Sequence, residues 1–457
     1  MTILPSLVKG MRDYNSLQVY RRNYILSVIQ SIYALYGFEP LETPALENRT
    51  TLTGKYGQEG EQLIFHVLKS GNFLEGIASA INLKDYKKLN PLISDKGLRY
   101  DLTIPLMRHI AANHHQICFP FRRYQMQPVW RADRPQRGRY REFLQCDADI
   151  VGSNSLLCEA EILKLIYDVC TKLGIRDFSI KINHRGLLSA IADAENEKLF
   201  CTIVDKSEKI GFEKVMAALT AAGFSKETIA SLTLFQNFKG SNAQLLIQLE
   251  QTIGHTDQGA KGVEALSSIL THAYGLGLPD GVCVIEPTLA RGLAYYTGLV
   301  MELTVAGTPI GSLGGGGRYE GLGELFGARG RTGVGFSFGI DRLYDLMEEQ
   351  NLFESITNYT TEVLLTNIEE KVEEEILHLL SQLRAASFKA ELYPERVKIR
   401  KQLAYAHKKN IPFVIILGET ESAMNHYTLK NMQTGVQNSY SWPELCEVLK
   451  IALVAKG

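Results

Sequence analysis

The spacing of apolar residues changes several times along the chain, and each spacing predicts a different kind of element. From Leu17 to Tyr36 apolar residues recur every three or four positions, which predicts an amphipathic helix. Over 119–131 and again over 140–151 apolar and polar residues alternate, which predicts two strands. The loop between them contains Pro135 and Gly138, so the two strands are expected to form a hairpin.

The same patterns predict the other elements of the first part of the chain. Glycines and charged residues over 51–75 favour a mobile loop. Further strands are expected at 39–46, 97–103 and 178–184, and further helices at 104–113 and 154–173.

Residues 186–275 differ from the strand-rich segments around them, because they resemble several short amphipathic helices. This segment is predicted to be an inserted helical domain. Two strands then follow around a turn at Arg291 and Gly292, and a glycine-spaced strand leads into a helix near 347.

The second part of the chain begins after a polar linker at 348–360. Strands and helices alternate there as βαβαβ, which predicts a compact α/β domain with a mixed sheet over 361–457. The sequence therefore predicts an α+β protein with an antiparallel, strand-rich domain over 1–347 that contains the helical insertion at 186–275.

Composition narrows the class of protein. The 457 residues, 45% of them hydrophobic, are enough for two or three domains with their own cores. With 49 basic and 50 acidic side chains, the protein is not a general coat for nucleic acid, so any such contact must be local. Seven scattered cysteines without a CxxC pair indicate reduced thiols and no zinc site. Neither a signal peptide nor a membrane span is evident, so a cytoplasmic protein is expected.

The predicted hairpin carries a local excess of positive charge that suits a polyanion. A solvated hairpin tip is the alternative, but Phe143, Gln145, Asp147 and Asp149 alternate along the return strand and favour a lined cleft. Its seven arginines are Arg122, Arg123, Arg131, Arg134, Arg137, Arg139 and Arg141.

Two further features favour a phosphate-bearing ligand. Four consecutive glycines precede Arg318 and Tyr319, and they fit either close approach of a ligand or tight packing of strands. Arg131, Arg291 and Arg342 stand beside predicted strand ends, and three converging guanidinium groups would suit an anhydride substrate. For each arginine alone, a structural salt bridge is the simpler explanation.

These segments resemble a known family. WRAD at 130–133, followed by Arg139 and Phe143, resembles motif 2 of class II aminoacyl-tRNA synthetases, and GVGFSFGIDRL resembles their motif 3. ARGLAYYTGLVMEL and GGGGRYEGL resemble the two signature peptides of histidyl-tRNA synthetases. The resemblance also includes KGMRDY near the N-terminus, the predicted strand LRYDLT at 98–103 and the C-terminal α/β domain, so it covers nearly the whole chain.

The resemblance implies a histidine–tRNA ligase that uses L-histidine, ATP with Mg²⁺, and tRNA(His). Arg131 and Arg291 would be catalytic, clamping the α-phosphate and the histidine carboxylate. Histidine would be bound by Asp101, Thr103, Arg131, Gln145, Asp149, Arg291, Tyr295, Tyr296 and Tyr319. ATP would be bound by Arg131, Asp133, Arg139, Phe143 and Arg342.

The resemblance also implies two contacts with tRNA and a homodimer. The hairpin tip, with Arg134, Gln136 and Arg137, would meet the acceptor stem. The C-terminal domain would bind the anticodon, and its basic residues there are Arg396, Lys398, Arg400, Lys401, Lys408 and Lys409. The helix from Leu17 and the strand at 39–46 would supply the dimer interface.

The chain departs from the family at a few positions, and two other functions compete. Ala294 replaces an acidic or amide residue, and Asp133 and Asp101 stand where glutamate is found in other members. A histidine-binding regulatory subunit or a sensor of uncharged tRNA would share the fold without the chemistry. Both would bind their ligand without turnover, so exchange between ATP and pyrophosphate separates them from an enzyme.

Overall fold

The computed structural model describes residues 4–53, 57–74, 86–192, 196–290, 295–327, 330–353 and 361–454. The chain forms two compact units, which are described in turn. The first takes the residues up to Asp13 and from Arg22 to Leu352, and the second takes Tyr14–Arg21 and the residues from Phe353 onwards. Every helix in these ranges is too short or too polar to cross a lipid bilayer.

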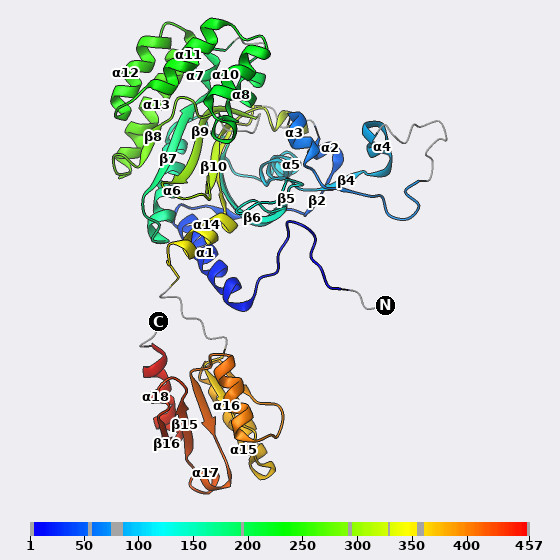
Figure 1. Ribbon diagram of the computed structural model, residues 1–457, viewed down its shortest axis with the longest axis vertical. Coiled ribbons are helices and arrows are strands. Elements are labelled where there is room, and N and C mark those ends of the chain that lie inside the picture. The colour runs from blue at the N-terminus through cyan, green and yellow to red at the C-terminus, as the bar shows by residue number, and fades with distance from the viewer. Residues whose placement is uncertain are drawn as a thin grey trace. The chain divides into compact units, whose positions relative to one another are not determined.

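The first unit is built on an eight-stranded sheet (Figure 1). Its inner strands pair antiparallel, and the outermost pairs, β1 with β5 and β7 with β8, are parallel. The predicted antiparallel sheet is therefore confirmed. In spatial order the strands are β1 (Glu39–Pro40), β5 (Phe121–Trp130), β6 (Glu142–Val151), β11 (Gly333–Gly339), β10 (Gly314–Tyr319), β9 (Tyr296–Val305), β7 (Phe178–His184) and β8 (Cys283–Ile285).

The two faces of this sheet differ, and the alternation along β6 shows why. Cys146 and Ala148 are buried on one face, where the Tyr33 hydroxyl of α1 donates a hydrogen bond of 2.8 Å to the Cys146 carbonyl. Since successive side chains of a strand point to opposite faces, Gln145 and Asp147 lie on the other. The helices that contact the covered face are α1 (Ser16–Leu35), α6 (Leu157–Lys172) and α14 (Ile340–Glu349).

A three-stranded sheet with four helices holds the segments for which the sequence predictions are wrong. The predicted strand at 39–46 is instead two strands in two sheets, because Pro44 and its neighbours leave the large sheet after Pro40. The predicted loop over 51–75 contains a helix and a strand in its described part, since Leu52 and Ile64 are buried in a core cluster. The elements are β2 (Leu46–Asn48), α2 (Arg49–Leu52), α3 (Gly57–Gln62), β3 (His66–Val67), α4 (Tyr86–Ile93), β4 (Lys96–Leu98) and α5 (Thr103–Asn113).

The strand predicted at 97–103 is also shorter than expected. It ends at Leu98, and the helix α5 begins at Thr103 after its N-cap Leu102. The Asp101 carboxylate accepts a 3.1 Å hydrogen bond from the Ile104 backbone, which fixes the Asp101 side chain at the start of α5.

The helical segment leaves the sheet after β7 and returns to it at β8, which pairs with β7. In the described residues this segment consists of helices joined by short turns. Ser225, Ser241 and Thr256 begin three of its helices by accepting backbone hydrogen bonds. The helices are α7 (Arg185–Ser189), α8 (Glu197–Val204), α9 (Ser207–Ile210), α10 (Phe212–Ala221), α11 (Lys226–Asn237), α12 (Asn242–Ile253) and α13 (Asp257–Gly275).

The second unit has a five-stranded mixed sheet in the order β13-β12-β14-β15-β16, as the alternating pattern predicted. Val363 and Leu365 of β12 pack against α15 and α18, whereas Leu364 between them packs towards Ala406 of α16. The elements are β12 (Val363–Leu365), α15 (Glu373–Ala385), β13 (Ala390–Leu392), α16 (Ile399–Lys408), β14 (Phe413–Ile416), α17 (Glu419–Ala423), β15 (Tyr427–Asn431), β16 (Gln437–Tyr440) and α18 (Trp442–Val454).

Candidate active site

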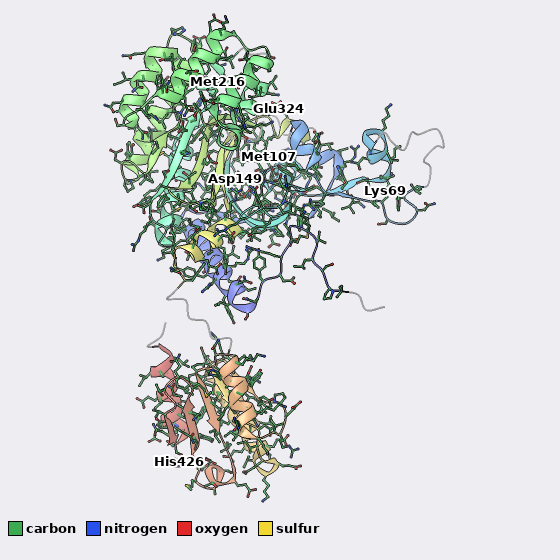
Figure 2. All side chains as sticks on the ribbon, in the orientation of Figure 1. Lys69, Met107, Asp149, Met216, Glu324 and His426 are labelled. Carbon is green, nitrogen blue, oxygen red and sulfur yellow. The ribbon has the colours of Figure 1, made fainter. Side chains whose placement is uncertain are left out.

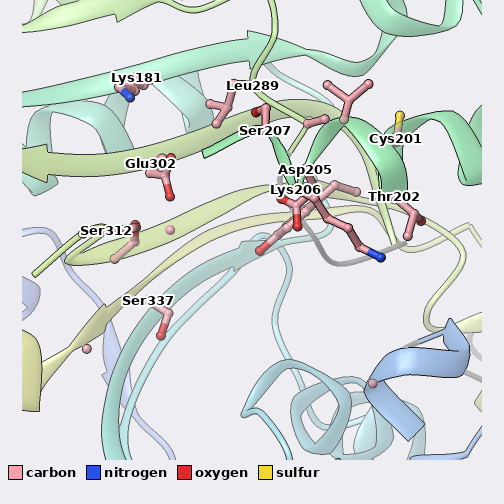
Figure 3. Close-up of a pocket in the computed structure, with 18 of the residues that line it drawn as sticks. Lys181, Cys201, Thr202, Asp205, Lys206, Ser207, Leu289, Glu302, Ser312 and Ser337 are labelled. Atoms are coloured by element: carbon pink, nitrogen blue, oxygen red, sulfur yellow. The ribbon is translucent and has the colours of Figure 1, made fainter. Parts of the chain in front are cut away.

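The open face of the large sheet forms the floor of a cavity of about 1890 Å³ (Figure 3). Its walls come from the hairpin loop, the start of α5, α14 and helices α7 and α8. We call one end the acidic end, lined by Asp101, Thr103, Gln145, Asp147 and Tyr295. We call a second part of the cavity the arginine end, and it is lined by Arg131, Asp133, Arg139, Phe143 and Arg342.

The register of the sheet places polar side chains in one row across the floor. Asp147 of β6 is opposite Ser337 of β11, which is opposite Gly315 of β10. Gly315 is opposite Glu302 of β9, which in turn is opposite Lys181 of β7. Figure 3 shows Ser337, Glu302 and Lys181 along this row. Because Gly315 has no side chain, the floor is open between the Ser337 hydroxyl and the Glu302 carboxylate.

The sequence left two explanations for the four glycines at 314–317, close approach of a ligand and tight packing of strands. The structure shows mostly the second. A Cβ at Gly316 would lie 2.0 Å from the Gly335 carbonyl oxygen, and one at Gly317 would lie 2.4 Å from that of Leu299. At Gly314 it would lie 2.6 Å from the Ser337 carbonyl. Gly314 and Gly315 also line the cavity, so the run serves both purposes.

At the acidic end, three predicted side chains come together. The Tyr295 hydroxyl lies 3.3 Å from Asp101 Oδ2 and 3.5 Å from Thr103 Oγ1, and all three residues are buried. Asp101 is held from behind by the Ile104 backbone. The carboxylate is therefore fixed in place before any ligand arrives.

Asp149 and Tyr319, predicted to face the imidazole, lie behind the wall rather than in it. Asp149, labelled in Figure 2, accepts a 2.9 Å hydrogen bond from the Tyr319 hydroxyl and pairs with Arg123 at 3.0 Å. Neither Asp149 nor Tyr319 is among the described residues that line the cavity. Burial raises the pKa of Asp149, although Arg123 and Tyr319 act in the opposite direction. Gly335 is required beside them, because a Cβ there would lie 2.0 Å from Asp149 Oδ1.

Asp147 is a candidate functional residue that the sequence interpretation noticed in the alternating strand but did not assign. It lines the cavity, is 3% exposed and shares a hydrogen bond with Ser337, whose hydroxyl accepts a 2.6 Å hydrogen bond from Gln145. Within the described residues, Asp147 Oδ1 and Gln145 Oε1 are buried without a hydrogen-bond partner. Buried acceptors of this kind require a donor, and a ligand can supply it.

The burial of Asp147 also changes its acidity. Desolvation raises its pKa from 3.8 to about 7, and the nearby Asp149 adds to the rise while Arg123 opposes it. A perturbed carboxyl group that lines a cavity is typical of a functional site.

At the arginine end, the predicted residues are also brought together. The Arg131 Nε donates to the Tyr100 carbonyl at 3.1 Å, and its guanidinium lies 5.1 Å from the centre of the Phe143 ring. Arg139 grips Asp133 through two hydrogen bonds of 3.0 and 3.2 Å. Arg342 donates to the carbonyls of Gly138, at 2.7 Å, and Ser312.

The loop at the tip of the hairpin is closed by backbone hydrogen bonds in both directions between Gln136 and Arg139. Gly138 adopts a φ of +69°, which favours glycine in this turn. Gln136 and Arg137 line the cavity mouth, and Arg134 is exposed outside it. Arg137 forms an ion pair with Glu349 at 3.5 Å, and because both side chains are exposed this pair contributes little stability.

The other predicted positions have the following places. Tyr296 lines the cavity, and Arg291 and Ala294 lie outside the described residues. Three arginines of the hairpin had no predicted partner. Arg122 binds Glu161, Arg123 binds Asp149, and Arg141 donates to the Asp133 carbonyl.

The predicted basic residues of the second unit are exposed, and part of them meet carboxylates. Arg396 pairs with Glu370 at 2.6 Å, Lys401 with Glu395 at 3.5 Å and Lys409 with Glu391 at 2.5 Å. Lys398 and Arg400 are exposed at the start of α16. These ion pairs are accessible to solvent, so each contributes little and can be exchanged for a phosphate.

Comparison with known proteins agrees with this geometry. A family model described as histidyl-tRNA synthetase matches residues 10–343, and one described as an anticodon binding domain matches residues 362–451. A Cytophaga hutchinsonii protein named histidine–tRNA ligase is 46% identical over 449 residues, which cover 97% of this chain and 99% of that protein. A Porphyromonas gingivalis protein of the same name is 44% identical over 438 residues, covering 95% and 96%.

A solved structure gives the same result in three dimensions. The crystal structure of histidyl-tRNA synthetase from Nostoc has a TM-score of 0.80 and 31% sequence identity, covering 99% of this chain and 100% of that chain. Sequence, fold and cavity agree, and the chain belongs to the histidyl-tRNA synthetase family.

Proposed function

We propose that this chain is a histidine–tRNA ligase, which activates L-histidine with ATP and transfers it to the 3′ end of tRNA(His). The observation that carries the proposal is the presence of both ends in one cavity, with Arg131 beside Tyr100 and close to Asp101. A carboxylate-rich site for an amino acid thus adjoins a cluster of guanidinium groups for a triphosphate.

At the acidic end, the proposed ligand is histidine. Asp101 and Thr103 would accept hydrogen bonds from its α-ammonium group, and Gln145 Oε1, which is buried without a partner in the described chain, would complete that set. We assign the imidazole to Tyr295, Tyr296 and the unpartnered Asp147 Oδ1. Asp149 and Tyr319 would then support this pocket from behind.

At the arginine end, the proposed ligand is ATP. Phe143 and Arg342 would hold adenine between a ring and a planar guanidinium, and Asp133 would accept from its amino group. Arg139 would bind the outer phosphates in place of Asp133. The Arg139 side chain is 34% exposed in its ion pair with Asp133, so a phosphate can reach it and replace the carboxylate.

The chemistry needs little beyond position and charge. A histidine carboxylate oxygen attacks the α-phosphorus, a phosphorus–oxygen bond forms, and the bond to pyrophosphate breaks. Arg131, together with Arg291, would stabilise the negative charge that builds on the α-phosphate. The ribose hydroxyl of tRNA then attacks the acyl carbon, AMP leaves, and a hydroxyl proton is released.

Mg²⁺ is proposed to accompany ATP. The described residues contain no cluster of three or more metal-binding side chains, which suits an ion held mainly by the phosphates. Glu302 lines the cavity and is a carboxylate that could complete its coordination. The ion would neutralise charge on the departing pyrophosphate.

The remaining partners are also proposals. Arg134, Gln136 and Arg137 are positioned at the surface for the acceptor stem, and Arg396, Lys398 and Arg400 for the anticodon. Leu46 is 45% exposed on β2, an edge strand, which supports a homodimer formed through this edge. The seven free thiols suit the reducing cytoplasm, where we place the protein.

The direct test is exchange of radioactive pyrophosphate into ATP. We expect exchange that depends on histidine and is not supported by phenylalanine. A folded preparation that binds histidine but does not catalyse exchange would overturn the proposal and favour a regulatory subunit. The variant Arg291→Ala is expected to lower exchange by orders of magnitude and to keep the thermal midpoint of the wild type.

A further inference from the structure

The segment before the first helix lies against the outer side of the hairpin loop. The Arg141 backbone amide donates to the Gly10 carbonyl at 2.8 Å, and the Arg141 guanidinium approaches the Lys9 carbonyl at 3.4 Å. Gly10 has a φ of +88°, and a Cβ there would lie 2.7 Å from Pro135 Cγ. The positive φ and the side chains of Pro135 and Arg141 beside it therefore favour glycine at this position.

Arg12 extends this contact to α14. Its NH1 donates to the Tyr140 hydroxyl at 2.8 Å, and its guanidinium lies 4.1 Å from the centre of that ring. Its NH2 donates to Asp341 Oδ1 at 3.1 Å. The same tyrosine donates to Asp345 Oδ2 at 3.1 Å, so one arginine joins the hairpin loop to the first turns of α14.

Asp341 carries the contact into the arginine end of the cavity. It is 2% exposed, and its second oxygen accepts a 3.1 Å hydrogen bond from the Leu144 backbone. Leu144 follows Phe143, and Asp341 precedes Arg342, which themselves line the cavity. A displacement of Asp341 would thus move the backbone next to both residues assigned to adenine.

We infer that Lys9–Arg12 is a positioning element for ATP, in which Arg12 acts through Tyr140 and Asp341 to fix the spacing between Phe143 and Arg342. The inference rests on the proposed function for its ligand. No atom of this segment lines the cavity among the described residues, so Arg12 does not act by touching ATP. The acidic end takes its side chains chiefly from the start of α5, from β6 beyond Leu144 and from Tyr295, and Asp341 is not among the residues that define it, so it should respond much less.

The test compares four variants in pyrophosphate exchange, with separate titrations of ATP and histidine. Arg12→Gln removes the charged hydrogen bonds to Tyr140 and Asp341, while Arg22 still binds Asp341 Oδ1 at 2.6 Å. We expect the KM for ATP to rise about fivefold or more and the KM for histidine to change less than about twofold. Arg12→Lys should restore part of the ATP affinity, because a cation still reaches Asp341 without the fork.

The segment itself supplies a matched pair. Lys9→Ala should leave both KM values unchanged, because only the Lys9 carbonyl is used. Gly10→Ala should resemble Arg12→Gln, because its Cβ would collide with Pro135. Thermal midpoints of all variants show whether a change in KM merely follows a loss of stability.

Two outcomes would overturn the inference: an unchanged KM for ATP in Arg12→Gln, or an equal rise for both substrates. Calorimetric titration with ATP, without histidine, distinguishes failure of the positioning role from failure of the proposed function. If the wild type binds ATP but shows no histidine-dependent exchange, the function is wrong, and weaker ATP binding by Arg12→Gln still supports the positioning role. Equal ATP binding by the two proteins would refute it.

Discussion

The carboxylates of the acidic end are buried, whereas the cations of the arginine end reach solvent. Asp101 and Asp147 are 2% and 3% exposed, and each is bonded to a fixed neighbour. The Arg139 side chain is 34% exposed, and its partner is Asp133 from the same loop. One end is thus formed in advance, and the other must exchange one ion pair for another.

This difference fits two kinds of recognition. Buried polar groups that are left unpaired by the wrong ligand cost much more than exposed ones, so the acidic end can discriminate between amino acids. Partly exposed guanidinium groups attract phosphates of any nucleotide, and their contribution falls with salt. Histidine specificity is therefore expected to depend on the acidic end, and ATP affinity on the arginine end.

The largest effect is expected from Asp147→Asn. At pH 8, where Asp147 is ionised, removal of its charge should raise the KM for histidine about 10- to 100-fold and leave the KM for ATP unchanged. A charged hydrogen bond is worth roughly 1.5–3 kcal/mol. Discrimination against thienylalanine, whose ring lacks nitrogen, should also fall. Exchange kinetics with both amino acids measure this.

The matched control for this variant is Asp168→Asn. Asp168 is a carboxylate of α6 that binds Tyr36 and Lys164 away from the cavity, so neither KM should change. If Asp147→Asn behaves like this control, the assignment of the imidazole to Asp147 is wrong.

The next effect is expected from Arg139→Ala. It should raise the KM for ATP about tenfold at low ionic strength and less in high salt, because the lost interaction is a partly screened charge pair. Arg122→Ala removes an ion pair of similar exposure, 31%, outside the cavity and serves as the control. A salt-independent change, or a change in the KM for histidine of the same size, would contradict the comparison.

Tyr319→Phe should have a smaller effect. It removes one hydrogen bond to Asp149 behind the wall, so we expect the KM for histidine to rise about fivefold, in line with roughly 1 kcal/mol for such a bond. An effect as large as that of Asp147→Asn would instead place Tyr319 in direct contact with histidine.

The smallest effect concerns stability and pH. Between about pH 4 and 7 the folded protein holds a proton on Asp147 that the unfolded chain has lost. The free energy of unfolding therefore falls as the pH rises through this range, and Asp147 causes no further change above about pH 7. Asn at this position has no such proton. The thermal midpoint of Asp147→Asn minus that of the wild type should therefore be more positive at pH 8 than at pH 5.

The outcome that would contradict this sign is a midpoint difference that is constant or decreases with pH. Groups other than Asp147 contribute to both proteins and largely cancel in the difference.

Much of the site could be predicted from the sequence, because local patterns specify it. The hairpin strands alternate cleanly and Pro135 and Gly138 mark their loop, so β5 and β6 were predicted to within about two residues at the loop side. Gln136 and Arg137 near its tip line the cavity, whereas Arg134 is exposed outside it.

The distinction between Asp147 and Asp149 could not be predicted, because it depends on a neighbouring strand. Both acids lie on the same face of β6, but Asp147 is opposite Ser337 and Asp149 is opposite Gly335. The space above Gly335 is filled by Asp149, to which Tyr319 and Arg123 bind. Neither the register nor the buried arginine can be inferred from spacing along one strand.

The prediction of a loop over 51–75 was wrong for a related reason. Its glycines suggest a loop, and its few apolar residues are too widely spaced for a clear period. Their burial comes from distant partners such as Tyr100 and Met107, so tertiary packing decides the structure there.

Calorimetric titration of histidine without ATP tests the central claim, that the acidic end is complete before the arginine end is filled. We predict that the wild type and Arg139→Ala bind histidine with Kd values within about twofold of each other, and that Asp147→Asn binds at least about tenfold more weakly. Equal binding by wild type and Asp147→Asn, or loss of histidine binding in Arg139→Ala, would contradict it.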